Sequence, residues 1–326
     1  MEYAIEVDNL TRVYETEQQG KGLRRIWPKK KTFRAVDSIS FKIKPGEFVG
    51  YVGANGSGKS TTIKMLTGVM IPSSGTAKCL GFVPWKQRYK YTYNIGVVFG
   101  QKSLLWTDLD VIESLKLYKD IYEISDKEFE SRLKYFSKIL DIDKILYRQA
   151  RKLSFGEKMR ANLAASLLHK PKVLFLDEPT VGMDVLAKEE VRNFLREINR
   201  KEGTTIMLTT HDMGDIEALC ERVIMLDKGQ IIYDGPLKKL KERYVDTKIV
   251  TARFNKIKNK NRLKTDLKKA KLIEMTDDVI KFSVNVKKHD INNVVNEGMK
   301  CLDIVDLTIE EQDLAEIVRN IYRSRR

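Results

Sequence analysis

The chain has 326 residues, of which 42% are hydrophobic and 32% are charged, and its formal net charge is +15. This length is sufficient for one large domain, or for one large and one small domain. No segment approaches the roughly eighteen uncharged apolar residues that a membrane-spanning helix needs, so the sequence predicts no such helix. The positive charge is compatible with nucleic acid, an anionic membrane surface, anionic ligands or a solvated lysine-rich surface, and it excludes none of them.

The N-terminal segment alternates between apolar and polar residues, which predicts a strand over residues 3–14. It carries acidic residues where a signal peptide would carry basic ones. A second alternating segment, residues 35–44, predicts the partner strand. The polar and basic residues 15–34 between them predict an enlarged loop. A solvated loop is slightly favoured over contact with lipid headgroups or a partner, for which Trp27 would be the anchor.

A glycine-rich segment at residues 53–61 is the strongest motif of the chain. It follows an apolar run that predicts a buried strand, and it opens into a predicted helix, which is the context of a phosphate-binding loop. Glycines allow successive backbone N–H groups to turn towards an anion. Lys59 is expected to reach the β- and γ-phosphates, and the Ser60 hydroxyl to bind Mg²⁺. The candidate nucleotide ligands are Gly53, Asn55, Gly56, Ser57, Gly58, Lys59, Ser60 and Thr61.

Helical periodicity replaces the strand pattern in the middle of the chain. Residues 76–83 predict a strand or hairpin piece, and residues 95–99 predict a short buried strand that is followed by Gln101. Apolar spacing over residues 108–153 indicates a helical subdomain, placed at about residues 104–168.

Two acidic residues, Asp177 and Glu178, follow the continuous apolar run at 173–176, as expected at the end of a central parallel strand. An aspartate there would hold Mg²⁺, and its neighbour would polarise the attacking water. Asp184 is the predicted N-cap of the next helix, and a further buried strand ends at His211. A histidine at a strand end is by itself more often a core or surface residue than a catalytic one.

The composition changes at about residue 245. Strands are predicted at residues 248–254, 279–284 and 302–309, and helices at residues 291–298 and 314–322. These elements are enough for a small α+β domain, and no chemical motif is present in it. Cys79, Cys220 and Cys301 are far apart, which favours small buried side chains over a metal site.

Taken in order, these motifs resemble the nucleotide-binding subunit of ABC transporters over about residues 3–240. The matching segments are the Walker A loop 53–61, the Q-loop residue Gln101, the signature-like segment 153–157, the Walker B segment 173–178, the D-loop-like segment 181–184, and the switch residue His211. Tyr14 stands where the family places an aromatic residue that stacks on adenine.

The resemblance implies an α/β fold with the ABC ATPase core of P-loop NTPases. This core has a mixed sheet with helices on both faces, an antiparallel β subdomain and a helical subdomain. The expected domains are an ATPase domain at residues 1–240 and a small α+β accessory domain at residues 245–326.

The resemblance also implies that two subunits pair head to tail around ATP. Ser154 and Gly156 would contact the γ-phosphate in trans, and Asp184 would act across the dimer. Glu178 would be the general base, and His211 and Gln101 would sense the γ-phosphate and Mg²⁺. The expected Mg²⁺ ligands are Ser60, Gln101 and Asp177.

The sequence departs from the family pattern in the signature, which has Phe155 in place of glycine and Glu157 in place of glutamine. Both changes could tune the equilibrium between the open and closed dimer. Met183 replaces the usual leucine of the D-loop, which conserves side-chain volume. The enlarged basic loop is also atypical, and Trp27 is a weaker candidate than Tyr14 for stacking on adenine.

The resemblance favours the energising subunit of an exporter with separate membrane subunits, located in the cytoplasm and peripheral on the inner face of the cell membrane. The expected partners are transmembrane permease subunits and a second nucleotide-binding subunit, with the membrane surface contacted only indirectly. The alternative is a soluble ABC ATPase acting on nucleic acid or ribosomes. Only the basic loop and the C-terminal lysines support it, so nucleic acid is not expected as a partner.

Overall fold

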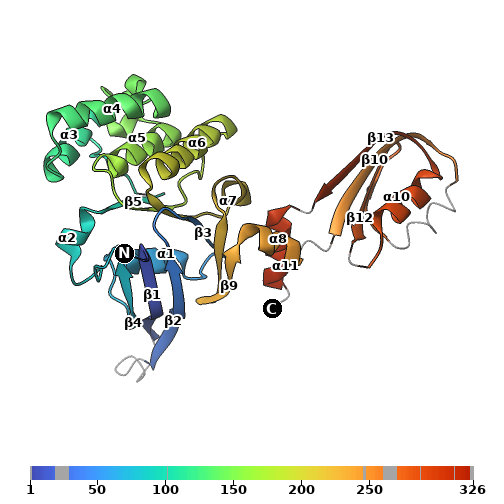
Figure 1. The fold of residues 1–326 in the computed structure, drawn as a ribbon, viewed down its shortest axis with the longest axis horizontal. Coiled ribbons are helices and arrows are strands. Elements are labelled where there is room, and N and C mark those ends of the chain that lie inside the picture. Colours follow the sequence, from blue (N-terminus) through green and yellow to red (C-terminus); the bar gives the residue numbers. More distant parts are fainter. Residues whose placement is uncertain are drawn as a thin grey trace. The chain divides into compact units, whose positions relative to one another are not determined.

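The computed structural model describes residues 2–18, 29–100, 102–244, 247–259, 270–286, 288–311 and 313–323. The chain forms two compact units, Met1–Pro236 and Leu237–Arg326 (Figure 1). Among the described residues, no helix has both the length and the apolar content required to cross a bilayer.

The first unit contains nine strands and seven α-helices in its described part. Its strands are β1 (Ile5–Gln18), β2 (Lys29–Ile43), β3 (Phe48–Gly53), β4 (Ser74–Cys79), β5 (Ile95–Phe99), β6 (Val173–Asp177), β7 (Thr205–Thr209), β8 (Arg222–Asp227) and β9 (Gln230–Pro236). Its helices are α1 (Lys59–Leu66), α2 (Arg88–Thr92), α3 (Val111–Ile121), α4 (Asp126–Leu140), α5 (Phe155–Leu167), α6 (Val185–Glu202) and α7 (Met213–Leu219), with two 3₁₀ helices at Asp143–Ile145 and Ala150–Lys152.

Six strands form the main sheet, in the order β5-β6-β7-β3-β8-β9. All neighbours are parallel except β8 and β9, which form an antiparallel hairpin. The central strands β3, β6 and β7 are buried along almost their whole length, as continuous apolar runs require. Because ligands of open α/β sheets gather at the carboxyl ends of the strands, the segments that follow β3, β6 and β7 are placed to form a site.

A second sheet, in the order β2-β1-β4, is antiparallel throughout. The prediction of an enlarged loop over residues 15–34 was wrong at both ends, because β1 continues to Gln18 and β2 begins at Lys29. The register pairs Tyr14 with Phe33, Glu15 with Thr32 and Glu17 with Lys30, so the strand pairing continues through this segment. Trp27 lies outside the described residues.

The helical segment predicted after residue 108 is present as α3, α4 and the two 3₁₀ helices, followed by α5. Figure 1 shows α3, α4, α5 and α6 together on one side of the main sheet, with β1, β2 and β4 on the other. Phe136 of α4 and Phe194 of α6 are fully buried and their ring centroids are 5.9 Å apart. The short helix α2 was not predicted, because five residues carry too little periodicity.

The second unit contains α8 (Leu237–Tyr244), β10 (Thr247–Ile257), β11 (Ala270–Met275), β12 (Val279–Asn285), α10 (Ile291–Met299), β13 (Leu302–Glu311) and α11 (Leu314–Arg323). Its sheet is antiparallel, in the order β11-β12-β10-β13. The buried face of the sheet forms a core with α10, for example through Val250, Phe282 and Val294.

The C-terminal helix α11 lies in the second unit, where it packs on another helix of that unit. Its apolar stripe, Leu314, Ile317, Val318 and Ile321, is buried, and α11 contacts α8. Helix α8 was not predicted, since its eight residues include four lysine or arginine side chains and few apolar ones. The predicted burial of the three cysteines is confirmed.

Candidate functional site

The loop between β3 and α1 has a backbone that only glycine allows at two positions. Gly56 and Gly58 have φ angles of +80° and +106°, in the left-handed region that residues with a Cβ avoid. A Cβ on Gly58 would lie 2.4 Å from the carbonyl oxygen of Ala35 in β2, which is a severe overlap. The loop is therefore held between the main sheet and the antiparallel sheet in one defined conformation.

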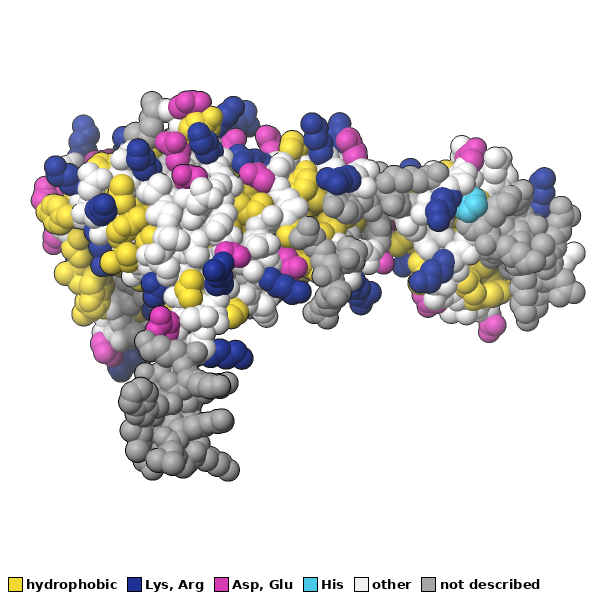
Figure 2. Space-filling view, turned by 90° about the horizontal axis from the view of Figure 1, so that it is seen from below, with side chains coloured by type: hydrophobic (Ala, Val, Ile, Leu, Met, Phe, Trp, Pro, Cys, Tyr) yellow, Lys and Arg dark blue, Asp and Glu magenta, His cyan; other side chains and the backbone are white. Residues whose placement is uncertain are grey.

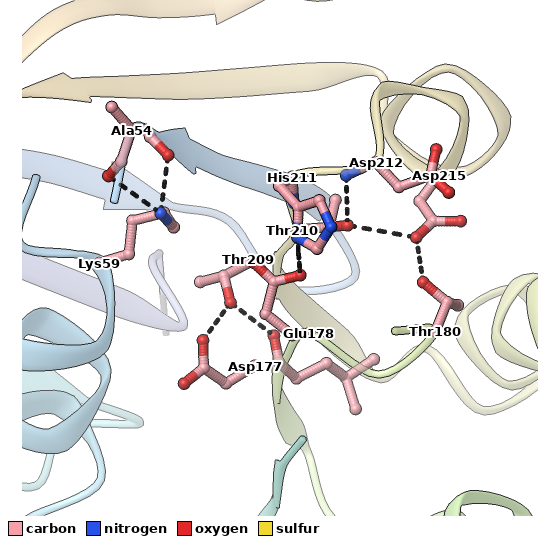
Figure 3. Close-up of polar contacts among 12 residues, drawn as sticks. Ala54, Lys59, Asp177, Glu178, Thr180, Thr209, Thr210, His211, Asp212 and Asp215 are labelled. Carbon is pink, nitrogen blue, oxygen red and sulfur yellow. Dashed lines mark hydrogen bonds and ion pairs between the residues drawn. The ribbon is translucent and has the colours of Figure 1, made fainter. Parts of the chain in front are cut away.

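The ammonium group of Lys59 folds back over this loop. Its Nζ donates hydrogen bonds to the carbonyl oxygens of Gly53 at 2.7 Å and Ala54 at 3.3 Å (Figure 3). Burial lowers the pKa of Lys59, while the negative charges of Glu178 and Asp177 oppose that effect only in part. The two carboxylates are therefore close enough to act electrostatically on the lysine.

The same loop fits an anionic phosphate group. Helix α1 begins at Lys59 with Gly58 as its N-cap, and no side chain caps the first turn. The buried Oγ of Ser57 has no hydrogen-bond partner within the described part of the chain. An uncapped helix start and an unsatisfied buried hydroxyl are both groups that phosphate oxygens can bind. The exposed side chain of Ser60 lies in the first turn of the same helix.

Asp177 lies at the end of β6 with its orientation fixed by the neighbouring strand. Its partner in the sheet register is Thr209, whose hydroxyl donates a hydrogen bond to Asp177 Oδ1. The backbone N–H of Gly100 donates to the Asp177 carbonyl oxygen at 2.7 Å. Thr209 was missed in the sequence, although its place at the end of an apolar strand before His211 was a usable sign.

The structure brings Glu178 and His211 into direct contact. The Nδ1 atom of His211 lies 2.7 Å from Oε2 of Glu178, and the backbone N–H of His211 donates to the same oxygen at 3.4 Å (Figure 3). Glu178 has a φ angle of +58°, which is unfavourable for a residue with a Cβ. Strained backbone of this kind persists where the surrounding structure determines it, and it is common at functional sites.

The signature-like segment forms the N-terminus of α5. Ser154 is the N-cap: its Oγ accepts a hydrogen bond from Glu157 N at 3.3 Å, and Glu157 Oε2 accepts one from Ser154 N at 2.7 Å. Arg148 forms an ion pair with Glu157 at 2.6 Å. Burial raises the pKa of Glu157, but the hydrogen bonds from Ser154 and Arg148 outweigh this and lower it. Glu157 thus completes a capping box, which glutamine could also form, and its charge is paired with Arg148.

Other predicted residues lie away from the phosphate loop. In the described chain, no hydrogen bond or ion pair joins Ser154 or Gly156 to residues 53–61, and a Cβ on Gly156 would meet only open space. Asp184 is exposed and caps α6 by accepting a hydrogen bond from Ala187 N at 2.9 Å. The ring of Phe155 is packed beside Gly182 of the D-loop-like segment.

Tyr14 lies in β1 with one ring face already occupied. The guanidinium carbon of Arg12 is 5.1 Å from the ring centroid, and the Tyr14 hydroxyl is 3.3 Å from the sulfur of Met70. Stacking on adenine would use the other face of the ring, and this role stays a prediction. Gln101 lies outside the described residues.

Comparison with known proteins places this geometry in a family. Residues 36–181 match the family model described as ABC transporter. The chain is 34% identical over 219 residues to the ABC transporter ATP-binding protein NatA of Bacillus subtilis, which is 67% of this chain and 89% of NatA. The chain belongs to the family of ABC transporter ATP-binding proteins. As a member of this family it binds nucleotide and is an ATP hydrolase, which confirms the resemblance seen in the sequence.

Two further relatives of this ABC ATPase have names that state a role. The linearmycin resistance ATP-binding protein LnrL of Bacillus subtilis is 33% identical over 217 residues, which is 67% of this chain and 68% of LnrL. The probable multidrug ABC transporter ATP-binding protein YbhF of Escherichia coli is 36% identical over 211 residues. That match covers 64% of this chain but only 36% of YbhF. These relatives favour a transporter subunit over the alternative of a soluble ATPase acting on nucleic acid.

Solved structures confirm the predicted fold class of the ABC ATPase core. The cbiO1 protein of Clostridium perfringens, part of the ABC transporter complex cbiONQ, has a TM-score of 0.60 and 28% identity, covering 74% of this chain and 91% of that one. The dimeric post-hydrolysis structure of the ATP-binding cassette MJ0796, bound to ADP and Pi, has a TM-score of 0.61 and 24% identity. It covers 72% of this chain and 98% of that one, and at this identity it shows the fold alone.

Proposed function

We propose that this ABC ATPase energises an exporter with separate membrane subunits, and that it hydrolyses ATP at sites shared between two nucleotide-binding subunits. The observation that supports shared sites is the division of the predicted residues within one chain. The phosphate loop, Asp177, Glu178 and His211 gather at one edge of the sheet, whereas Ser154 and Gly156 form an open helix start. A second subunit would supply that helix start to the phosphate of the first.

Bound Mg²⁺ would supply positive charge that offsets the charge developing on the phosphate oxygens. Ser60 and Asp177 would hold it, together with Gln101. Within the described residues, no three His, Cys, Asp or Glu side chains gather as a metal site. That is compatible with Mg²⁺, which commonly binds through one or two carboxylates and the phosphates of its substrate.

Glu178 would act as the general base, and His211 would orient it. The 2.7 Å contact between His211 Nδ1 and Glu178 Oε2 fixes one carboxylate oxygen and leaves the other for the attacking water. Lys59 would leave its contacts with the loop carbonyls to bind the β- and γ-phosphates, because a charge-assisted hydrogen bond to phosphate is the stronger one. These roles belong to the side chains of one subunit, before the second nucleotide-binding subunit binds to it.

An exposed patch of aromatic and aliphatic side chains on α2, α3 and the loop before α3 would bind the membrane subunits. The chain would then be peripheral on the inner face of the cell membrane. Tyr89 and Ile121 are 77% and 51% exposed, and Trp106, Leu109 and Leu117 are also exposed. The rings of Tyr89 and Tyr93 are 5.6 Å apart and in edge contact. Figure 2 shows hydrophobic side chains gathered at the end of the first unit where Figure 1 has α2. Contiguous exposed apolar side chains mark binding surfaces for proteins.

Co-purification from detergent-solubilised membranes tests this function. We expect hydrophobic partner chains to accompany the wild type and to be lost from Tyr89→Glu and Ile121→Glu. Tyr147→Glu is the matched control, because Tyr147 is 78% exposed and takes part in none of these ring contacts. A soluble particle that binds RNA or DNA in a salt-sensitive manner, without membrane chains, would overturn the proposal in favour of the nucleic-acid alternative.

A further inference from the structure

A fully buried carboxylate lies behind the candidate catalytic pair. Asp215, on α7, has no exposed surface. Its Oδ1 accepts a hydrogen bond from Arg192 Nε at 2.7 Å and forms an ion pair with Arg192 Nη2 at 2.6 Å. Its Oδ2 accepts hydrogen bonds from the hydroxyls of Thr180 and Thr210, the latter at 3.3 Å (Figure 3).

The two threonines belong to the segments that carry the catalytic pair. Thr180 lies two residues after Glu178, in the segment that leaves β6. Thr210 immediately precedes His211, in the segment that leaves β7. One carboxylate oxygen therefore ties together the segments whose relative position decides whether Glu178 and His211 meet.

A neighbouring set of contacts fixes the segment of His211 further. The hydroxyl of Thr210 accepts a hydrogen bond from Asp212 N at 3.0 Å, and Asp212 forms an ion pair with Lys188 of α6 at 2.6 Å. The N–H of Gly214 donates to Asp212 Oδ1 at 2.9 Å. The residues on both sides of His211 are thus held by side chains of α6 and α7.

Such a buried charge is poorly explained by stability alone. Removing a carboxylate from water costs free energy that an ion pair repays only with good geometry, and apolar replacements of buried pairs are often no less stable. Burial lowers the pKa of Arg192, but the hydrogen bond and charge of Asp215, with the charges of Asp212 and Glu189, outweigh this and raise it. Arg192 is therefore held charged at this position, and its contacts with Asp215 fix one geometry.

We propose that Asp215 is a positioning residue for ATP hydrolysis, which holds Glu178 and His211 in contact through the hydroxyls of Thr180 and Thr210. The proposal rests on the roles given above to Glu178 and His211. Asp215 should affect hydrolysis and not nucleotide binding, because the phosphate loop follows β3 and makes none of these contacts. Loosening the network should lower kcat and leave the KM for ATP nearly unchanged.

The test compares threonine-to-valine variants, which remove a hydroxyl and conserve shape. In the full chain, Thr180→Val and Thr210→Val should each lower kcat by about tenfold or more, because small displacements of catalytic groups have large effects on rate. KM for ATP should change by less than about twofold. In the double variant, the fold decrease in kcat should be smaller than the product of the two single decreases, because both hydroxyls act through one carboxylate.

Thr204→Val is the matched control. Thr204 is also buried, and its hydroxyl donates to the Pro171 carbonyl at 3.2 Å, near the start of β7 rather than its end. The Thr204→Val variant should lower Tm about as much as the other two variants and leave kcat unchanged. If Thr180→Val and Thr210→Val have the same kcat as Thr204→Val, the proposed role of Asp215 is wrong.

A second readout does not depend on turnover. The chain has only three histidines, so the ¹⁵N resonances of His211 can be followed in histidine-labelled protein. In Thr180→Val and Thr210→Val, the His211 resonances should move towards the chemical shifts that they have in Glu178→Gln. In Thr204→Val they should not move. Unshifted His211 resonances would overturn the inference, whereas a wild type that does not hydrolyse ATP would overturn the proposed function instead.

Discussion

At the scale of single residues, the candidate site consists of side chains whose positions are set by other side chains. Glu178 is held by His211, and Asp177 by the hydroxyl of Thr209. The motif residues could be predicted from sequence because their spacing is tied to one chemistry. For Thr209 the only sign was its place at a strand end before His211. Asp215 could not be predicted, since an aspartate in a short helix is common and acquires meaning only through contacts distant in sequence.

The ion pair of Arg148 and Glu157 should matter when phosphate approaches α5. Glu157 lowers the positive potential of this helix start, and Arg148 neutralises its charge. Arg148→Ala should therefore raise the KM for ATP hydrolysis on the order of threefold, the scale of a partly exposed ion pair. Glu157→Gln should restore it in the double variant, because glutamine keeps the hydrogen bond without the charge. Steady-state kinetics of the two single variants and the double variant check this. An Arg148→Ala defect that persists in the double variant would contradict it.

At the scale of elements, periodicity predicted most of the structure, and the errors have physical causes. The long buried strands and amphipathic helices were predicted because burial imposes a repeating pattern. Helix α2 was missed because its five residues give too little periodicity, and α8 because four of its eight residues are lysine or arginine. The extension of β1 and β2 was missed because its residues, apart from Phe33, are polar or charged and resemble a loop in the sequence.

The cap of α5 allows stability and function to be separated. Ser154→Ala should cost about 1 kcal/mol of stability through the lost N-cap, and it should also reduce turnover. Ser125→Ala is the control, because Ser125 caps α4 through the same kind of bond, from Glu128 N. Thermal unfolding should show similar losses for both variants, with ATPase activity reduced only in Ser154→Ala. Equal activities would remove Ser154 from the proposed site.

The contact between His169, two residues after the end of α5, and β5 predicts a pH dependence of stability. His169 stacks on Tyr122 with ring centroids 3.8 Å apart, and Nε2 lies 3.0 Å from the Ile95 carbonyl oxygen. Burial lowers the pKa of His169 from 6.5 to about 4, opposed by the bond to Ile95 and assisted by the charge of Arg132. Because the unfolded chain binds this proton at higher pH, stability from neutral His169 is lost as pH falls from 6.5 to about 4.

His169→Phe keeps a ring at this position and removes the titrating group. Its Tm should fall less than that of the wild type between pH 6.5 and about 4. Parallel Tm curves for the two proteins would show that His169 does not carry this dependence.

At the scale of the whole molecule, the central claim is that one chain holds only half of each hydrolysis site. The phosphate loop and the catalytic pair belong to one half, and the start of α5 belongs to the other. ATP between the two halves would join two subunits, and hydrolysis would release them, which gives the motion that drives the membrane partners. If the general base is lost, the joined state should persist.

The most direct test measures the mass in solution of Glu178→Gln, with ATP and Mg²⁺ or with ADP. The account predicts turnover reduced by about 100-fold or more. It also predicts that Glu178→Gln has twice the mass of the chain in ATP and the mass of a single chain in ADP. The double variant Glu178→Gln/Ser154→Arg should have the mass of a single chain with either nucleotide. A Glu178→Gln protein that hydrolyses ATP at the wild-type rate, or that stays a single chain with ATP bound, would contradict it.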